Sequence, residues 1–599
     1  MRARAGDPPR TMTQKVLAGR ADDPELKGEL VRVKVDQVIL AREPQRVLGE
    51  ALNAGMKKCA VEVAVAYDTR CVTTDGAETA GDRVMRAALG TGLLLSRPGI
   101  GFPAPVHLER FGSPARLALT DEPRLAAVGG TGMLTLVAAP SQLAEALATG
   151  AIWLRPPRSV QVLLSGRIRP FVCVRDVALE LVRRGLGDTI QRVDREHQAP
   201  VVVEFAGPSA RLLSVPDRAV LAALGPHLGA TAAVFVSDEK TEVYLRDQRR
   251  SKAHRSLVPD PGAPCDDVIS VDLSAVDPLV MDEQGVVRPV RELAGKPVVQ
   301  VVLGGDTGAS LRDLLAAAAL LKSKRVPPRL DLLIAPPSRQ ALEVLAHSGA
   351  LVDLIATGAR LIEPDQRLVT GELYPPPAGG VSLRTCDPEP SAPLDRRFVV
   401  ASAETIAYAV ASGTVGDPRS FKRPVRVTVP RTLPTDDVLI VRKAKAKGKA
   451  DGDGGKAGAS TVPPPVGWSG PATLAVIKER VTPTGPSAML LSSLDAVRWA
   501  ARHASELGAL RAVVAEHIPA GIVPLFAALG IAALTTDQAT LKKLAQEPSL
   551  LLPGPGGTEV TATAGATKAE LRWAALGAER AWTEAGTARG SATVAKPGR

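Results

Sequence analysis

Short apolar runs alternate with amphipathic stretches along most of the chain. β-rich runs such as CAVEVAVAY, SVQVLLSG, APVVVEFAG and VVQVVLGG are interspersed with stretches of helical spacing such as DVALELVRRGL and SRQALEVLAHSGALVDLIATG. Apolar runs of this length, bounded by turn residues, are typical of buried strands. Their alternation with helical patterns is the signature of α/β layers. We therefore predict an α/β fold.

One segment interrupts this alternation. Residues 441–468 read VRKAKAKGKADGDGGKAGASTVPPPVGW, and a composition of lysine, glycine, proline and small polar residues excludes a packed core. We interpret it as a flexible linker. Beyond it, RWAARHASELGALRAVVAEH and AGIVPLFAALGIAALTTD predict helix, strand, helix and strand. This pattern indicates a separate, smaller α/β domain.

Composition narrows the class of protein. With 599 residues and 45% hydrophobic content, the chain is long enough for three or four domains. Its five scattered cysteines form no CxxC pair, which favours a reducing compartment over a disulfide framework. The N-terminus is followed by no apolar leader and no run approaches eighteen apolar residues, so we expect a cytoplasmic protein without a membrane span. The net charge of +11 permits a nucleic-acid partner without requiring one.

The stretch VVLGGDTGASLRDLLAAAALL, residues 301–321, joins an apolar run to a helical pattern through a glycine-rich turn. Free N–H groups at a helix N-terminus attract phosphate or carboxylate, so an anion site is the functional interpretation. The turn has neither the GK[ST] ending of a phosphate loop nor the GxGxxG spacing of a dinucleotide fold. A structural turn and an anion site both remain open.

Four longer segments resemble the aconitase and 3-isopropylmalate dehydratase family, in its single-chain bacterial and archaeal form. They are LLLSRPGIGFPAPVHLERFGSPARLAL, LAAVGGTGMLTLVAAPSQLAEALATG, LLSVPDRAVLAALGPHLGATAAVFVSDEKTEVYL and GARLIEPDQRLVTGELYPPPAGGVSLRT. The resemblance implies three α/β/α domains around a central cleft and a mobile swivel domain. It places the first two domains at residues 11–290, the third at 291–420, a linker at 421–470 and a shortened swivel-like domain at 471–590.

In active members of that family, three cysteine thiolates hold a four-iron cluster, which acts as a Lewis acid on the leaving hydroxyl. The first cluster loop of the family reads GSCTNGR, and here GGDTGAS places Asp306 at the cysteine. Gln366 and Val369 stand at the two cysteines of the second loop. The chain is thus identified as a degenerate member, for which we expect no cofactor and no cluster.

The substrate-binding positions differ as well. The family's Asp-His pair matches Asp68 and Thr69, and its Asp-Ser-His triplet matches Glu122, Pro123 and Arg124. No counterpart is found for the swivel's Gly-Ser-Ser-Arg loop. If the fold is kept, charged side chains should converge on the old cleft, and the candidates are Asp68, Arg70, Glu122, Arg124, Asp306 and Arg384. Two interpretations remain open, salt bridges that fill the space and a remodelled pocket for an anion or a hard metal.

Three functions follow from these observations. The first is a non-catalytic structural or regulatory protein, whose partner is an active homologue or another protein. The second is a hydro-lyase of aconitate hydratase or isopropylmalate dehydratase type that acts on small carboxylic acids. The third is RNA binding, suggested by the basic surface and by the RNA binding of some cluster-free aconitases, although an aromatic content of 3% leaves few stacking platforms.

Overall fold

The structure is a computed structural model. It describes residues 8–71, 85–86, 88–389, 392, 394–435, 438–441, 470–554, 559–565 and 567–585. The lysine-rich stretch within the predicted linker, residues 442–469, lies outside these ranges. Among the described helices, none combines the length and the apolar character needed to cross a membrane.

The first sheet has the strand order β19-β4-β3-β2-β5-β6 and is parallel except for β19. Its strands are β2 (Gln37–Leu40), β3 (Val63–Tyr67), β4 (Leu94–Ser96), β5 (Leu117–Thr120), β6 (Leu134–Val137) and β19 (Ile440–Val441). One face packs on α1 (Met12–Ala18), α2 (Pro44–Asn53) and α5 (Pro140–Thr149). The other face packs on α4 (Pro103–Arg110) and the 3₁₀ segment η1 (Pro123–Thr131). Burial on both faces explains why these strands read as continuous apolar runs.

The second sheet is parallel, in the order β10-β9-β8-β11. Its strands are β8 (Arg158–Ser165), β9 (Val201–Ala206), β10 (Ala232–Phe235) and β11 (Asp267–Asp272). Its core includes residues of α6 (Val174–Arg183), α7 (Leu186–His197) and α8 (Val215–His227). A small ribbon of β1 (Val31–Lys34) and β7 (Ala151–Leu154) and helix α9 (Glu239–Asp247) lie outside this sheet.

The third sheet has the order β13-β12-β18-β17-β14-β15-β16. Its strands are β12 (Leu279–Met281), β13 (Val287–Pro289), β14 (Val298–Gly304), β15 (Asp331–Ala335), β16 (Arg360–Leu361), β17 (Val381–Arg384) and β18 (Val399–Ala401). Its core includes residues of α10 (Leu311–Leu321), α11 (Arg339–His347), α12 (Ala350–Thr357) and α13 (Ala403–Ser412). Alternate residues of β14 face opposite ways, since Val301 joins the helix-covered core and Val302 a cluster with Phe102 of the first unit.

The C-terminal unit is a closed barrel with the order β20-β21-β22-β23-β26-β25-β24. Its strands are β20 (Ala472–Lys478), β21 (Ser487–Leu491), β22 (Leu510–Ala515), β23 (Ala532–Thr535), β24 (Ser549–Leu552), β25 (Glu559–Ala564) and β26 (Thr567–Trp573). Its helices are α14 (Leu494–His503), α15 (Val523–Ala527), α16 (Gln538–Leu544) and α17 (Gly577–Ala585). In β21, Ala488 and Leu490 fill the barrel, whereas Met489 and Leu491 pack beneath α14 and α15.

Close backbone contacts join the first two sheets. A Cβ atom on Gly129 would lie 1.9 Å from the carbonyl oxygen of Ala233, and one on Gly130 would lie 2.6 Å from the amide nitrogen of Ala219. These glycines sit in η1, which packs on α8 and β10. Only a residue without a side chain allows this approach, so the VGGTG motif fixes how the two sheets pack.

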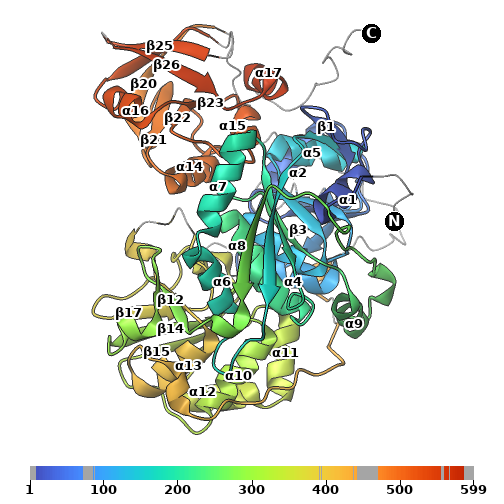
Figure 1. Cartoon of the computed structure of the whole chain (residues 1–599), viewed down its shortest axis with the longest axis vertical. Helices are drawn as coiled ribbons and strands as arrows, with labels where there is room; N and C mark the ends of the chain where they lie inside the picture. Colours follow the sequence, from blue (N-terminus) through green and yellow to red (C-terminus); the bar gives the residue numbers. More distant parts are fainter. Residues whose placement is uncertain are drawn as a thin grey trace.

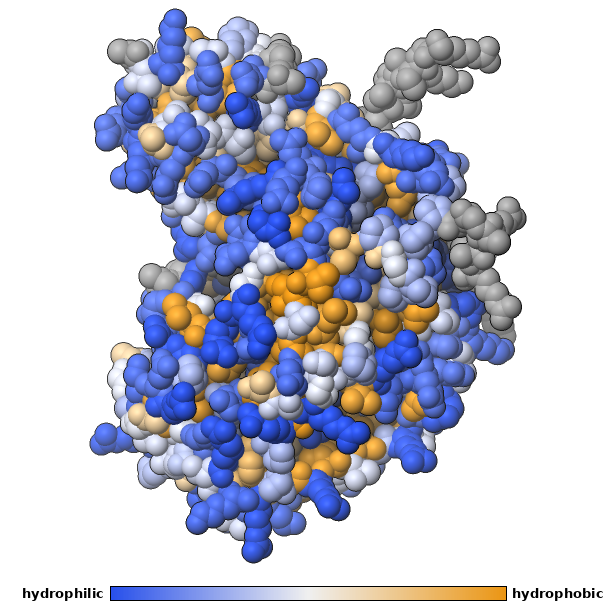
Figure 2. Space-filling model, viewed as in Figure 1, coloured by the Kyte–Doolittle hydropathy of each residue, from blue (hydrophilic) through white to orange (hydrophobic). Residues whose placement is uncertain are grey.

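Each of the three sheets with its helices is called a unit, numbered in the order given above, and the barrel with its helices is the C-terminal unit. The four units form an elongated molecule in which the C-terminal barrel and the third sheet lie at opposite ends (Figure 1). The barrel docks on the first unit, where Trp582 of α17 packs with Ala139 and Ala528. A buried ion pair joins Glu579 of α17 to Arg155. Hydrophilic side chains dominate the visible face, and apolar residues gather near its middle (Figure 2). The α/β class expected from the sequence is confirmed.

Candidate functional site

The GGDTGAS turn lies between β14 and α10, where Ser310 caps the helix by accepting a hydrogen bond from the Asp313 amide. A Cβ atom on Gly308 would lie 1.8 Å from the Thr385 carbonyl oxygen. The Thr385 hydroxyl donates to the Gly304 carbonyl at 2.6 Å. The turn is therefore pressed against the loop after β17, and the side chain of Asp306 projects toward the first unit.

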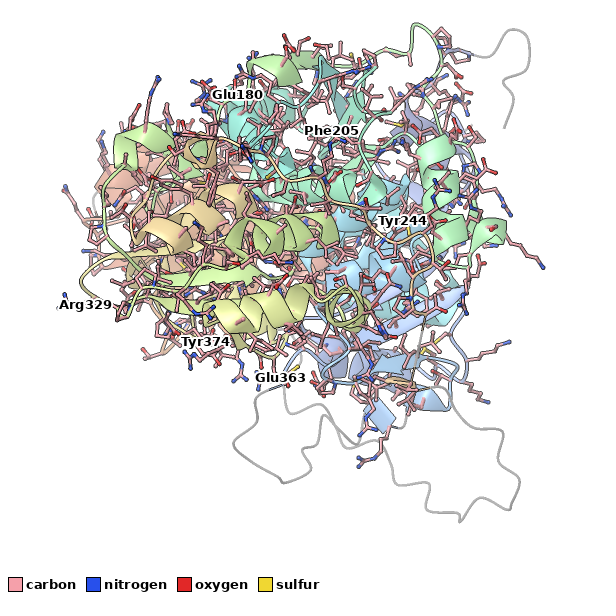
Figure 3. The ribbon with its side chains drawn as sticks, turned by 90° about the horizontal axis from the view of Figure 1, so that it is seen from below. Glu180, Phe205, Tyr244, Arg329, Glu363 and Tyr374 are labelled. Atoms are coloured by element: carbon pink, nitrogen blue, oxygen red, sulfur yellow. The ribbon has the colours of Figure 1, made fainter. Side chains whose placement is uncertain are left out.

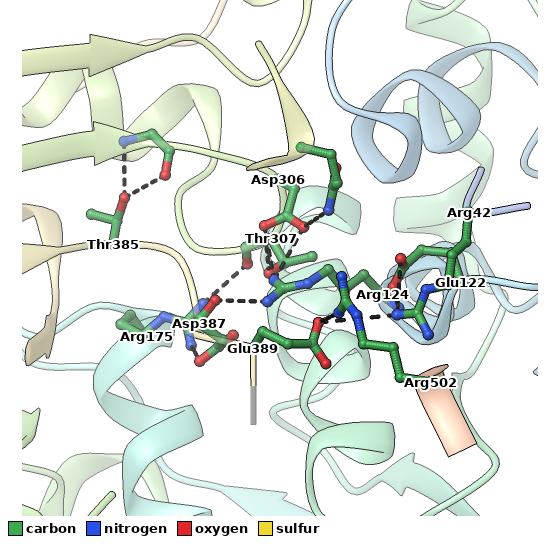
Figure 4. A network of polar contacts seen from close by, with 12 residues as sticks. Arg42, Glu122, Arg124, Arg175, Asp306, Thr307, Thr385, Asp387, Glu389 and Arg502 are labelled. Carbon is green, nitrogen blue, oxygen red and sulfur yellow. Dashed lines mark hydrogen bonds and ion pairs between the residues drawn. The ribbon is translucent and has the colours of Figure 1, made fainter. Parts of the chain in front are cut away.

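Asp306 forms a buried ion pair with Arg124 (Figure 4). Nη1 of Arg124 lies 3.1 Å from both carboxylate oxygens, and the two side chains are 3% and 1% exposed. Nε2 of Gln366 donates to Asp306 at 3.1 Å, and the Thr307 hydroxyl donates at 3.3 Å. Burial acts to lower the pKa of Arg124, but Asp306 and neighbouring carboxylates outweigh it and raise that pKa. A charge pair thus occupies the turn.

Two further ion pairs extend this network. Arg175 donates to Asp387 at 2.6 Å and to the Thr307 carbonyl at 3.1 Å. Glu389 forms an ion pair with Arg502 of α14. Burial acts to raise the pKa of Glu389, but Arg502 and other arginines outweigh it and lower that pKa. The network therefore joins all three sheets to the C-terminal unit.

The remaining members of the network are on the first unit, where Arg42 Nη2 lies 3.3 Å from Glu122 and 4.0 Å from Glu389. Glu122 and Arg124 lie on the segment that leads from β5 into η1. Of the sequence-predicted candidates, Glu122, Arg124 and Asp306 are thus brought together.

Asp68, Arg70 and Arg384 are placed elsewhere, contrary to our expectation. Asp68 and Arg70 are exposed on the loop after β3, where water solvates their charges at no cost in burial. Arg384 is fully buried in β17 but donates to the carbonyl oxygens of Leu368 and Tyr374 and stacks on the Phe398 ring at 4.3 Å. Its role is to anchor the loop of residues 368–374, and it does not line the charged network.

The three positions matched to cluster cysteines do not offer a thiolate. Asp306 and Gln366 are bonded to each other, and Val369 is buried against Cys386, Phe398 and Val400. Burial raises the pKa of Cys386 to about 12, so this nearby thiol is held neutral. These residues do not fit a thiolate-held cluster, which needs deprotonated sulfur ligands.

The expectation of no cofactor is nevertheless wrong. The side chains of Cys173, Asp313 and Glu404 are buried, and one potential ligand atom of each lies within 4.8 Å of the other two. The structure therefore contains a group that could hold a metal ion, built from residues that the sequence analysis did not single out.

A cavity of about 130 Å³ lies beside the charged network, between the first two units and the C-terminal unit. Its charged and polar lining residues are Arg42, Glu43, Asp121, Glu122, Arg124, His227, Thr231, Glu389, Arg498, Arg502 and Ser505. Nε of Arg42 and Nη2 of Arg498 are buried and have no hydrogen-bond acceptor among the described residues. A buried guanidinium donor without an acceptor is costly, so two of the arginines that line the cavity have hydrogen-bonding capacity left for a further acceptor.

Two titratable groups of the cavity are shifted toward their neutral forms. Burial, and then the charge of Arg124, lowers the pKa of His227. Burial raises the pKa of Asp121 to about 6, although its carboxylate accepts hydrogen bonds from the amides of Ala41 and Glu43. A neutral imidazole can take up a proton, whereas Asp121 carries a proton mainly below its pKa of about 6. The cavity therefore carries a candidate general base and, at mildly acidic pH, a candidate general acid.

Sequence reasoning missed Arg42, His227, Arg498 and Arg502. Arg498 and Arg502 are four residues apart in α14, and this spacing places two cations on one helix face. The four-residue spacing of these two arginines is the sequence feature from which they could have been predicted as a binding pair. Arg42 and His227 follow β2 and end α8 respectively, and no local pattern distinguishes them.

Comparison with known proteins supports a relationship to hydro-lyases. A model of the Aconitase family (aconitate hydratase) matches residues 125–286. The 3-isopropylmalate dehydratase large subunit 2 of Archaeoglobus fulgidus is 25% identical over 69% of this chain and 99% of its own length. The Deinococcus radiodurans 3-isopropylmalate dehydratase large subunit 1 and the Thermus thermophilus homoaconitase large subunit are each 30% identical over 59% of this chain, covering 80% and 83% of their own lengths. Together with the parallel α/β sheets, these matches show that the chain belongs to the aconitase family.

Proposed function

We propose that the chain is a hydro-lyase that adds or removes water at a small hydroxy acid bearing two or more carboxylates. The observation that carries the proposal is a cavity of 130 Å³ lined by the four arginines Arg42, Arg124, Arg498 and Arg502. Two of these, Arg42 and Arg498, also hold a buried guanidinium donor without an acceptor among the described residues. Carboxylate is the acceptor that guanidinium groups bind most strongly, through charge-assisted hydrogen bonds. The names of the relatives, isopropylmalate dehydratase and homoaconitase, favour this substrate class.

In this proposal each cavity residue has a distinct role. Arg42 and Arg498 bind the substrate carboxylates and stabilise the charge that develops when a carbon next to a carboxylate loses its proton. His227, as a neutral imidazole, takes that proton. Asp121, which holds a proton mainly below its raised pKa of about 6, gives that proton to the departing hydroxyl. One C–H and one C–O bond then break, a C=C bond forms and water leaves.

The domain arrangement supports a site that is complete within one chain. Arg498, Arg502 and Ser505 come from the C-terminal unit, whereas Arg42 and His227 come from the first and second units. The relatives are named as large subunits. We propose that the C-terminal unit of this chain supplies the part of the site that a separate partner would otherwise contribute.

A second candidate is a non-catalytic homologue that binds the same acids and regulates through occupancy. The observation that favours it is the buried Arg124–Asp306 pair with Gln366, because these side chains fill positions where the family resemblance places reactive groups. Binding without turnover is the expected behaviour of such a protein.

Direct assays separate the two candidates. Purified full-length chain is mixed with isopropylmalate, citrate or isocitrate, with and without added divalent metal ions, and the unsaturated acid is followed by ultraviolet absorbance and chromatography. Turnover that is lost in His227→Ala supports the hydro-lyase. Calorimetric binding without turnover supports the non-catalytic homologue, and the absence of both binding and turnover overturns both.

A matched pair of variants tests the cavity itself. Arg498→Gln removes a cavity guanidinium, whereas Arg329→Gln removes an exposed one at the outer margin of the third unit (Figure 3). Binding of the acids should weaken in the first variant and stay unchanged in the second. Equal effects, or no effect of Arg498→Gln, would exclude this cavity as the site.

A further inference from the structure

The group of Cys173, Asp313 and Glu404 lies apart from the residues that line the proposed active-site cavity. Each residue stands at the N-terminus of a different helix. Cys173 is the N-cap of α6, Asp313 is the third residue of α10, and Glu404 is the second residue of α13. The first helix belongs to the second unit and the other two to the third, so the group spans a boundary between units.

The three side chains are nearly inaccessible to solvent. Their exposed fractions are 3% for Cys173, 4% for Asp313 and 6% for Glu404. Among the described residues, Oε2 of Glu404 has no hydrogen-bond partner. Burying a carboxylate oxygen without a hydrogen-bond partner costs free energy unless a proton or a cation binds to it. The orphaned oxygen is therefore an independent indication that something occupies the group.

The charges around the group are predominantly negative. Asp176 is fully buried and accepts hydrogen bonds from the amides of Cys173 and Leu279, both at 2.9 Å. Arg312 is a cation beside Asp313, with Nη1 3.5 Å from Oδ1 of Asp313, but the Arg312 side chain is 47% exposed. The helix N-termini supply partial positive charge. That charge falls short of balancing three carboxylates and a thiolate.

The donor set selects the class of cation. One thiolate with two carboxylates suits a borderline-soft ion such as Zn²⁺, whereas Mg²⁺ and Ca²⁺ prefer oxygen alone. Separations within 4.8 Å permit closure on one ion after small rotations of the side chains. Asp176 accepts a hydrogen bond from the Cys173 amide and so fixes the backbone of this ligand. Residues that hydrogen-bond to metal ligands orient them in the same way.

We propose that Cys173, Asp313 and Glu404 bind a Zn²⁺ ion that fastens the second unit to the third. The thiol releases its proton to solvent on binding, and the ion supplies the positive charge that the helix N-termini lack. The fourth coordination position is left for water. The role is structural, because none of the three residues lines the active-site cavity.

Metal analysis of the full-length chain tests this site. Protein purified without chelators should contain one equivalent of zinc by mass spectrometry, and should bind Zn²⁺ again after chelation. Cobalt substitution should give a thiolate-to-cobalt charge-transfer band. Both signals should disappear in Cys173→Ser and Glu404→Gln and persist in Cys59→Ser, whose thiol lies beside the Thr91 hydroxyl instead.

Stability supplies a second readout if a variant folds poorly. Chelation should lower the melting temperature of the unmodified chain, and added Zn²⁺ should restore it. Unmodified protein that binds no zinc, or zinc that remains equally bound in Cys173→Ser and Glu404→Gln, would overturn the proposal. The first result would mean that protons satisfy these carboxyl groups, and the second that the zinc binds elsewhere.

Discussion

Replacing Asp306 by asparagine should destabilise the chain by far more than a surface change does. The substitution keeps the size of the side chain and an oxygen that can accept from Gln366, but it removes the negative charge that faces Arg124. Since the two side chains are only 3% and 1% exposed, water does not replace the lost carboxylate. Breaking a buried pair in this way costs about 3–5 kcal/mol.

A double-mutant cycle measures how much of this loss of stability comes from the interaction between Arg124 and Asp306. Arg124→Met alone leaves Asp306 buried without its cation and should cost a similar amount, whereas the double variant Arg124→Met/Asp306→Asn leaves no unpaired charge. Apolar replacement of a buried pair is often neutral or stabilising, so the double variant should be more stable than either single variant. Because each single change costs about 3–5 kcal/mol and the double variant costs less than either, the two effects should fail to add by more than about 3 kcal/mol, above the range of about 0.5–3 kcal/mol that is usual for residues in contact.

Denaturant unfolding measured by circular dichroism provides the free energies. Asp331→Asn is the matched control, because its partner Arg360 lies 2.6 Å away in a pair whose side chains are 39% and 60% exposed. An exposed pair contributes about 0–1 kcal/mol. If Asp306→Asn costs no more than Asp331→Asn, or if the double variant loses the sum of the two single changes, the Arg124–Asp306 pair is not the buried charge pair that we describe.

Three further predictions concern other parts of the molecule. Arg498→Gln should weaken the binding of a dicarboxylic acid by roughly 10–150-fold in calorimetry, since a hydrogen bond to a charged group contributes about 1.5–3 kcal/mol; an unchanged Kd would contradict its assignment to the cavity. Burial raises the pKa of Glu109 from 4.5 to about 7, so the folded chain binds more protons there and loses stability as pH rises from 4.5 through 7. Glu109→Gln should therefore gain stability relative to the unmodified chain between pH 5 and pH 8 in parallel denaturant titrations, and a constant difference would refute the shift. Gly130→Ala should cost at least about 1–3 kcal/mol by overpacking, whereas Gly485→Ala, with open space around it, should leave the denaturation midpoint within error.

Local patterns predicted the layered fold because strands buried on both faces read as unbroken apolar runs. The run before Asp306 and the helix after it are found as β14 and α10. The proximity of Glu122, Arg124 and Asp306 also followed from the resemblance, since the loops that carry them meet where the three sheets converge. For these three residues, the charge of the side chain and its position in the family pattern were sufficient to predict that they meet.

Other residues could not be placed from the sequence because their positions depend on tertiary contacts. Whether a charged residue such as Asp68 faces solvent or a cleft is decided by neighbours far away in the chain, and Arg384 is drawn to carbonyl oxygens of a loop rather than to a carboxylate. Cys173 and Glu404 lie at the N-termini of helices in different units. Their meeting depends on how three helices pack, which no spacing within one element can indicate.

The wall of the cavity that we propose as the substrate site is divided between the first unit, through Arg42, and the C-terminal unit, through Arg498. A ligand that bridges these two guanidinium groups is also a cross-link between the units. By mass action, such a ligand would oppose their separation by about 2.7 kcal/mol at a hundredfold excess over its Kd. Occupancy of the cavity and the docking of the C-terminal unit are then two measures of one equilibrium, and each can be followed through the other.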